Sequence, residues 1–303
     1  MKPFKSIIEF QKFFSTDEKC RKFLEEQRWN GTPCCPFCGS VNVTRLKDKK
    51  RFQCNEKECR KQFSVTVGTI YENTKIPLTK WFLATYILAV HSKGISSLQL
   101  ANWLNVTQKT AWFLNHRIRE MLTEKAPELL DGIVEVDETY VGGSDRNRHA
   151  HKKGTKEKAM VLGAVARKGK VKTKVIPEAT TENINKTIKE FIQPDSTMLT
   201  DEHRAYRRLA EIYNHETVNH RDKEYVRAWV HTNSIEGYWN ILKKQIVGIH
   251  HTVSPKHLQR YCNENAFRYN NKEVTQDERF AEAVANCDGR LKYADLIHTP
   301  ETP

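Results

Sequence analysis

A carboxylate and an ammonium group share one predicted helical face in the segment from His231 to Lys244. Four apolar side chains recur there at helical spacing, which indicates an amphipathic helix: Ile235, Tyr238, Trp239 and Leu242. Glu236 leaves this helix beside the apolar stripe, and Lys243 lies two turns further along the same face. A carboxylate in this position is the ligand type that hard cations such as Mg²⁺ prefer.

An alternative role for Glu236 is structural. Asn233 could be the N-cap of the helix, and Glu236 at its third position could reach back to the cap amide in a capping box. The helix alone does not decide between a functional carboxylate and a capping one. The acids that precede it in the chain bear on the choice.

Two of these acids stand on predicted strands. Residues 133–141 alternate apolar and polar side chains and end at a glycine pair, which predicts a strand with Asp137 at its middle. Thr197 to Thr200 predict a short buried strand with Asp201 at its C-terminal tip, where open sheets present reacting groups. A lone acid on a strand can also keep an edge strand soluble, so Asp137 taken alone has a structural explanation too.

The elements around these acids follow a regular order. Residues 160–166 and 171–176 predict a hairpin with its turn at Lys168-Gly169-Lys170. A helix capped by Thr180 and Thr181 follows, and residues 215–218 predict another short strand. The chain therefore presents an acid on a strand, a hairpin, a helix, an acid at the end of a strand, and an acid on a helix.

The stretch from Ser144 to Lys174 is strongly basic. A charge run is usually a solvated loop, yet one beside a carboxylate strand can also hold the phosphates of a nucleic acid. Four of its cations are candidate DNA contacts: Arg146, Arg148, Lys152 and Lys153.

Four of the eight cysteines form two close pairs, Cys35 with Cys38 and Cys54 with Cys59. Two such pairs on opposing turns can place four thiolates tetrahedrally around one Zn²⁺. Cys34 could replace Cys35, although the two-residue gap between Cys35 and Cys38 suits a metal-binding turn better. The alternative is that these are unrelated buried cysteines.

Three helices are predicted between Pro77 and Leu122. The first is apolar nearly all round, a short second helix follows, and Thr107 caps the third. This succession is typical of a helix-turn-helix unit, with a plain helical bundle as the alternative. We expect the third helix to expose side chains suited to base edges and phosphates: Gln108, Lys109, His116, Arg117 and Arg119.

The chain has 303 residues and a formal net charge of +13, from 50 Lys and Arg against 37 Asp and Glu. This balance favours a polyanionic partner, nucleic acid first, and the length favours two or three domains. The longest apolar run, Trp81 to Val90, is about half a membrane span, and the N-terminus lacks a signal-peptide pattern. We therefore expect a soluble, cytoplasmic protein with no membrane partner.

The order of Asp137, Asp201 and Glu236, with Lys243 after them, resembles the Asp-Asp-Glu signature of insertion-sequence transposases. The cysteine pairs and residues 67–72, 134–143 and 231–239 are similar to the branch that carries an N-terminal zinc ribbon. The resemblance runs from about residue 30 to residue 272. It implies an α/β fold in which a ribonuclease H-like mixed sheet flanked by helices follows a small zinc ribbon and a helix-turn-helix unit.

This resemblance divides the chain into five expected parts. They are an N-terminal helical arm (1–30), the zinc ribbon (31–76), the helix-turn-helix unit (77–126), the catalytic domain (131–272) and a C-terminal tail (273–303).

The resemblance also implies an activity. A transposase of this kind binds the terminal inverted repeats of its mobile element, cleaves the DNA, and joins the freed 3′ end to target DNA, as a homo-oligomer in the DNA complex. It uses two Mg²⁺ or Mn²⁺ ions per active site, and the chain would hold one structural Zn²⁺. Asp137 would bridge both catalytic ions, Asp201 would hold one and Glu236 the other. Lys243 would hold the DNA near them.

Two departures from the family pattern leave alternatives open. The second cysteine pair encloses four residues where two are usual, and the third catalytic position varies within the branch, so Asn233 could take the place of Glu236. Two other classes of function also compete: an inactive, transposase-derived zinc-ribbon DNA-binding protein, and a ribonuclease H-like nuclease that cuts without joining. Intact Asp137 and Asp201 argue against the first, and a two-part DNA-binding N-terminus argues against the second.

Overall fold

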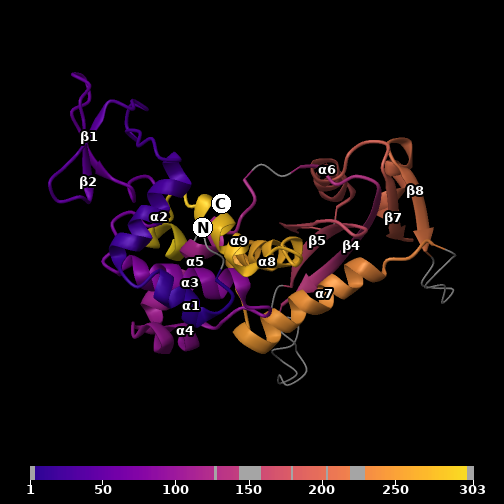
Figure 1. The fold of residues 1–303 in the computed structure, drawn as a ribbon. Helices are drawn as coiled ribbons and strands as arrows, with labels where there is room; N and C mark the ends of the chain where they lie inside the picture. Colours follow the sequence, from indigo (N-terminus) through magenta and orange to yellow (C-terminus); the bar gives the residue numbers. More distant parts are fainter. Residues whose placement is uncertain are drawn as a thin grey trace. The chain divides into compact units, whose positions relative to one another are not determined.

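The computed structural model describes residues 4–125, 128–142, 158–178, 180–202, 204–218 and 229–298. The chain divides into two compact units (Figure 1). Unit 1 comprises Met1–Thr123 and Glu273–Pro303, and unit 2 comprises Glu124–Lys272. No helix in the described ranges has both the length and the apolar character needed to cross a membrane.

Unit 1 begins with two helices and a small antiparallel sheet. Helices α1 (Ile7–Phe13) and α2 (Asp17–Trp29) precede strands β1 (Val43–Arg45), β2 (Arg51–Cys54) and β3 (Gln62–Ser64). Helices α3 (Leu78–Val90), α4 (Ser97–Leu104) and α5 (Gln108–Met121) follow. The three helices predicted between Pro77 and Leu122 are therefore confirmed, including the cap of the third by Thr107.

The end of the chain returns to unit 1 as α9 (Gln276–Ala285) and α10 (Tyr293–Ile297). Phe280 of α9 is fully buried, and its ring lies 5.0 Å from that of Phe10, 5.3 Å from Phe14 and 5.4 Å from Phe82. The segment that the sequence analysis treats as a C-terminal tail thus contains two helices, and aromatic packing holds the first of them against the N-terminal arm.

Unit 2 is built on one five-stranded sheet of order β6-β5-β4-β7-β8. Its strands are β4 (Ile133–Val141), β5 (Ala159–Ala166), β6 (Val171–Ile176), β7 (Thr197–Asp201) and β8 (Asn214–Val218). Strands β4, β5 and β6 pair antiparallel, whereas β7 and β8 continue from β4 in parallel. This mixed topology confirms the ribonuclease H-like fold class, and all five strands lie where the alternation and turn residues predict them.

Helices cover both faces of this sheet. On one face lie α6 (Thr181–Phe191) and the 3₁₀ helix η2 (Arg204–Glu211), which share a buried apolar cluster with β4 and β5. On the other lie α7 (Asn233–Gln245), which continues into a short π-helical turn (Ile246–His250), and α8 (Pro255–Asn270). The side chain of Asn270 bonds both the N–H and the C=O of Val171, which satisfies part of the exposed edge of β6.

Candidate functional site

The register of two parallel strands brings Asp137 and Asp201 together. Glu135 of β4 pairs with Leu199 of β7, and each aspartate lies two residues further along its own strand. Neighbouring strands are about 4.8 Å apart, and alternation places both aspartates on the same face of the sheet. That face is the one covered by α7, which carries the third acid.

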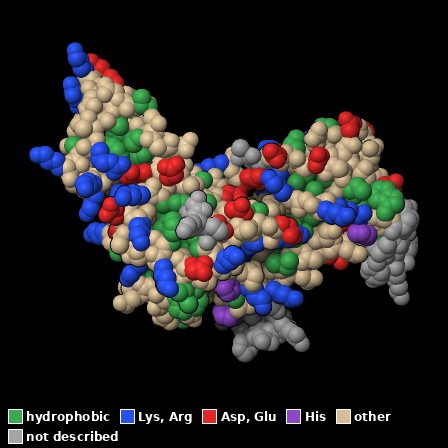
Figure 2. Space-filling view, in the orientation of Figure 1, with side chains coloured by type: hydrophobic (Ala, Val, Ile, Leu, Met, Phe, Trp, Pro, Cys, Tyr) green, Lys and Arg blue, Asp and Glu red, His purple; other side chains and the backbone are tan. Residues whose placement is uncertain are grey.

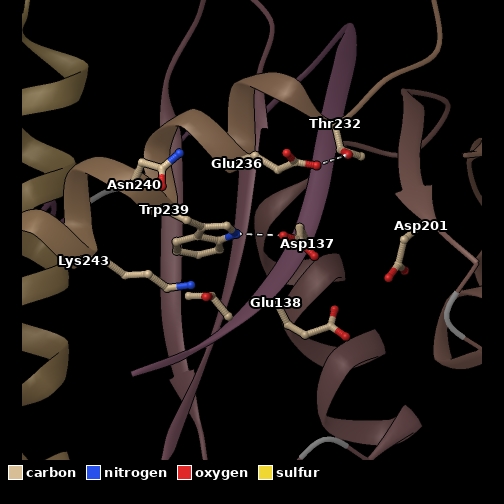
Figure 3. Close-up of a pocket in the computed structure, with 9 residues that line it drawn as sticks. Asp137, Glu138, Asp201, Thr232, Glu236, Trp239, Asn240 and Lys243 are labelled. Carbon is tan, nitrogen blue, oxygen red and sulfur yellow. Dashed lines mark hydrogen bonds between the residues drawn. The ribbon is translucent and has the colours of Figure 1, made fainter. Parts of the chain in front are cut away.

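Helix α7 adds Glu236 to the two aspartates. Its buried side chains, Ile235, Tyr238, Trp239 and Leu242, pack on β5, as their helical spacing predicts. Glu236 emerges beside them into a pocket of about 430 Å³, whose lining also includes Asp137, Asp201 and Lys243. Figure 3 shows the three acids approaching this pocket from two strands and one helix, with Lys243 further along the helix. The structure therefore brings together four of the five predicted catalytic residues.

The fifth candidate, Asn233, lies elsewhere. It is the first residue of α7, it is exposed, and it is not among the described residues that line the pocket. Thr232 is the N-cap, and its hydroxyl donates a 3.1 Å hydrogen bond to Oε1 of Glu236. The alternative of a capping box between Asn233 and Glu236 is therefore wrong, and Asn233 is not the N-cap.

A buried acid, Glu135, replaces that cap. Its carboxylate is fully buried on β4 and accepts hydrogen bonds from the backbone N–H groups of Ser234 (2.7 Å) and Ile235 (3.1 Å). These are helix N-terminal amides that have no partner within their own helix, so a carboxylate from the sheet stabilises the start of α7. The strand that carries Asp137 thereby fixes the helix that carries Glu236.

The charge of Glu135 is balanced by Arg167. The guanidinium Nε lies 2.8 Å from Oε1 of Glu135, and the same side chain donates to the carbonyls of Trp229 (2.7 Å) and His231 (3.0 Å). A buried carboxylate needs such a partner because an unpaired buried charge is costly. Sequence reasoning missed this pair, although an acid two residues before Asp137 on the same strand face was a visible signal.

The buried, negatively charged environment of Asp137 favours the binding of a cation. Burial raises the pKa of Asp137 to about 7, and the negative charges of Glu138 and Asp201 contribute to this rise. The indole N–H of Trp239 lies 2.9 Å from Oδ2 of Asp137 and acts in the opposite direction. Carboxylates crowded in this way repel each other unless a cation lies between them, and carboxylate oxygens are the donors that Mg²⁺ prefers. The donor set therefore fits divalent metal ions.

The cysteine cluster of unit 1 fits a different metal. The Sγ atoms of Cys35, Cys38, Cys54 and Cys59 all lie within 4.8 Å of one another, with 3.7 Å between Cys35 and Cys59 and 3.6 Å between Cys38 and Cys54. Tetrahedral Zn–S bonds of about 2.3 Å would place sulfurs roughly 3.8 Å apart. The cluster includes Cys35 and not Cys34, which settles that alternative and suits one structural Zn²⁺.

We expect a Cys38→Ser, Cys59→Ser double variant to lose its zinc. Two of the four thiolates would be gone, and a small three-stranded sheet depends on metal for much of its stability. Metal analysis of the purified protein measures this directly. Cys34→Ser is the matched control and should retain one zinc per chain. Unchanged zinc in the double variant would reject the assignment.

The structure corrects the predicted DNA-contacting face of α5. Lys109 in its first turn is exposed as expected, but His116, Arg117 and Arg119 are 0%, 7% and 1% exposed. The predicted exposure of these three side chains is wrong because α5 is enclosed by other parts of unit 1. The predicted contacts Arg146, Arg148, Lys152 and Lys153 lie outside the described residues.

Arg117 shows what these buried cations do instead. Its guanidinium lies 5.0 Å from the ring centre of Trp81 and 5.2 Å from that of Phe113, and it donates to the carbonyl of Glu72 at 3.2 Å. Cation–π contacts and a backbone carbonyl together hold the charge inside the unit. Arg117 therefore stabilises the helical part of unit 1.

A basic turn that the sequence analysis did not single out is exposed between β1 and β2. Lys47, Lys49 and Lys50 are all exposed there, while the nearby Asp48 is held by Arg51 at 2.7 Å. Figure 2 shows Lys and Arg side chains gathered over this part of unit 1. The signal in the sequence was the charge run Lys-Asp-Lys-Lys-Arg between the cysteine pairs.

Two segments of the chain match models of transposase domains. Residues 129–270 match the family model described as the ISXO2-like transposase domain, and residues 15–62 match the transposase zinc-ribbon domain. A protein in transposable element ISH50 of Halobacterium salinarum is 29% identical over 269 residues, covering 82% of this chain and 90% of its own length. An uncharacterised transposase-like protein of Haemophilus influenzae is 29% identical over 108 residues, covering 35% of this chain and 86% of its own.

Solved structures give weaker similarity. A chain in the Mos1 strand transfer complex has 15% identity and a TM-score of 0.26, covering 70% of this chain and 78% of that chain. A chain in the simian T-cell lymphotropic virus intasome with PP2A regulatory subunit B56 gamma has 13% identity and a TM-score of 0.29, covering 58% and 66%.

Proposed function

The chain belongs to the insertion-sequence transposases in which a zinc ribbon precedes an Asp-Asp-Glu transposase domain, and from this we propose that it cleaves the ends of its mobile element and joins them to target DNA. The observation that carries the proposal is the pocket that collects Asp137, Asp201 and Glu236. These acids come from two strands and a helix, and each is placed by a separate feature of the fold.

The three carboxylates would hold Mg²⁺ or Mn²⁺ at the phosphate that reacts. Bound divalent ions would lower the pKa of the attacking hydroxyl and stabilise the leaving oxygen. In cleavage, water attacks a phosphodiester at the end of the element and a 3′ hydroxyl leaves. In joining, that 3′ hydroxyl attacks a phosphodiester of the target, so one bond forms as another breaks. No covalent intermediate with the protein is needed.

Lys243 has a separate task in this scheme. It lies on the same side of α7 as Glu236 and lines the same pocket, but a lysine cannot ligate a metal while it is protonated. Its ammonium would instead hold a DNA phosphate beside the acids. This explains why an exposed cation belongs at the rim of a site built from carboxylates.

Lys47, Lys49 and Lys50, which are exposed in the turn between β1 and β2, would bind the DNA backbone outside this pocket. Lys109, at the exposed start of α5, is a second candidate contact, since the first residues of such helices are the ones that approach base edges. Arg146, Arg148, Lys152 and Lys153, in the basic stretch of the sequence after residue 144, would add DNA contacts that do not depend on base sequence. A homo-oligomer on the DNA completes the proposed assembly.

We expect replacement of Lys47, Lys49 and Lys50 with Ala to weaken DNA binding and its salt dependence. For every phosphate that the protein no longer neutralises, the slope of log affinity against log salt should fall by roughly 0.9. Binding titrations at several salt concentrations measure the slope. Replacing the exposed Lys186 and Lys189 of α6 is the matched control and should leave it unchanged. If the triple lysine variant and the wild type showed the same slope of log affinity against log salt, the turn between β1 and β2 would not be part of the DNA interface.

One assay tests the proposed function and distinguishes it from the two alternative functions, a nuclease and an inactive DNA-binding protein. Purified protein is mixed with Mg²⁺ and DNA carrying the inverted repeats that flank the gene, and with a target plasmid. We expect a free 3′ end and its covalent joining to the plasmid. Cleavage without joining would indicate a nuclease, and binding without either reaction would indicate an inactive DNA-binding protein.

A further inference from the structure

A glycine lies directly opposite Asp137 in the sheet. Gly163 of β5 is its partner in the antiparallel register. A Cβ atom at this position would lie 2.5 Å from Cη2 and 2.7 Å from Cζ2 of Trp239, far inside van der Waals contact. Only a glycine therefore leaves room for the indole ring to lie against the sheet at this point.

The position of the ring aims its one polar atom at the site. Trp239 is 4% exposed, and its Nε1 donates to Oδ2 of Asp137 at 2.9 Å. Indole N–H is a donor only, so this contact favours the ionised carboxylate and fixes its rotation. In Figure 3 the indole lies beside Asp137, with the hydrogen bond drawn between them.

The donor belongs to the helix that carries another acid of the site. Trp239 follows Glu236 by three residues, so both side chains leave neighbouring positions of α7. The start of the same helix is held to β4 by Glu135. One helix thus carries Glu236 and also donates a hydrogen bond to Asp137.

We propose that Trp239, seated against Gly163, is a positioning residue that occupies Oδ2 of Asp137 and presents the other carboxylate oxygen to a divalent metal. This inference rests on the proposed function. Groups that hydrogen-bond metal ligands reduce the reorganisation needed on binding, and their loss typically costs about 10- to 100-fold in metal affinity or activity. The competing explanation is that Trp239 only fills the core between α7 and β5.

Trp239→Phe separates these explanations because it keeps an aromatic ring over Gly163 and removes the N–H. Calorimetric titration of the full chain with Mn²⁺, without DNA, measures affinity apart from activity. We expect the dissociation constant to rise by about tenfold or more. Tyr238→Phe is the matched control: it is the adjacent buried aromatic residue of α7, and Mn²⁺ affinity should not change.

A second variant tests the contact between the Trp239 ring and Gly163. Gly163→Ala keeps the indole N–H but displaces the ring, so it should also weaken Mn²⁺ binding. Thermal denaturation of each variant reports folding separately. Wild-type Mn²⁺ affinity in Trp239→Phe would overturn the proposal. If Gly163→Ala then bound Mn²⁺ more weakly, the role of Trp239 would be packing and not the hydrogen bond.

The proposal and the proposed function fail in different ways. If wild-type protein binds Mn²⁺ and joins DNA while Trp239→Phe binds Mn²⁺ equally well, only the positioning role is wrong. If the wild-type protein neither binds Mn²⁺ nor joins DNA, the proposed function fails, and the positioning role fails with it.

Discussion

Asp137→Asn and Asp201→Asn are each expected to lower the rates of cleavage and joining by roughly 10²- to 10³-fold, the cost of removing one group that stabilises charge in a transition state. Asparagine keeps the size of the side chain but loses the charge that a divalent ion requires. In Asp137→Asn the amide oxygen can still accept from Trp239, so the local packing should survive. Gel assays of end cleavage and strand transfer in Mg²⁺ measure both steps.

End binding separates this loss from misfolding. Both variants should bind the element end with wild-type affinity, because the proposed DNA contacts of the ribbon lie in unit 1. Glu182→Gln, a change of an exposed acid in the first turn of α6, is the control for loss of one negative charge from unit 2 and should retain activity. Mg²⁺-dependent joining near the wild-type rate in either aspartate variant would remove that residue from the site.

Glu236→Gln is expected to cause a similar loss, whereas Asn233→Ser should keep most of the activity. Two aspartates, a phosphate and two divalent cations leave surplus positive charge, which a third carboxylate offsets and an amide does not. The amide oxygen introduced by Glu236→Gln would still accept from the Thr232 hydroxyl, so the helix start should persist. Asn233 is exposed and outside the pocket lining, and the cap of α7 comes from Thr232 and Glu135.

The same strand-transfer assay decides between the two residues. An active Glu236→Gln together with an inactive Asn233→Ser would assign the third catalytic position to Asn233. Circular dichroism of both variants checks that α7 has formed, because a helix missing from either variant would also abolish activity without saying which residue binds metal.

Local patterns were sufficient for most of the fold. Alternation, turn residues and caps predicted all five strands of the sheet in unit 2 and the helices α6 and α7, because each signal lies within a few neighbouring residues. The strand positions of Asp137 and Asp201 then followed from their place in those elements. Their proximity needed the topology as well, which the resemblance implied and the parallel pairing of β4 with β7 now shows.

Contacts between distant segments could not be predicted in this way. The helical spacing of α5 gives no sign that Trp81 of α3 stacks on Arg117, since that depends on how α3 packs on α5. The prediction of the α7 cap was wrong for the same reason, because Glu135, which accepts from the first amides of the helix, lies about a hundred residues earlier in the chain. Local sequence favoured Asn233 as the cap, and a buried carboxylate from the sheet took that role.

The pairing of Gly163 with Asp137 also depends on register. A shift of one residue would place a different side chain under Trp239, and no local pattern fixes that alignment. Only the assembled sheet shows why a glycine belongs in a strand that is otherwise apolar.

The central claim is that Asp137, Asp201 and Glu236 together hold the metal at which DNA reacts, and the location of bound Mn²⁺ tests it most directly. Anomalous diffraction from crystals of the catalytically active protein soaked in Mn²⁺ would show each ion by its own signal. We predict Mn²⁺ in this pocket at ligand distance from both aspartates, with Glu236 completing the site. Mn²⁺ bound elsewhere in an active protein, with no ion in contact with Asp137 or Asp201, would contradict the account.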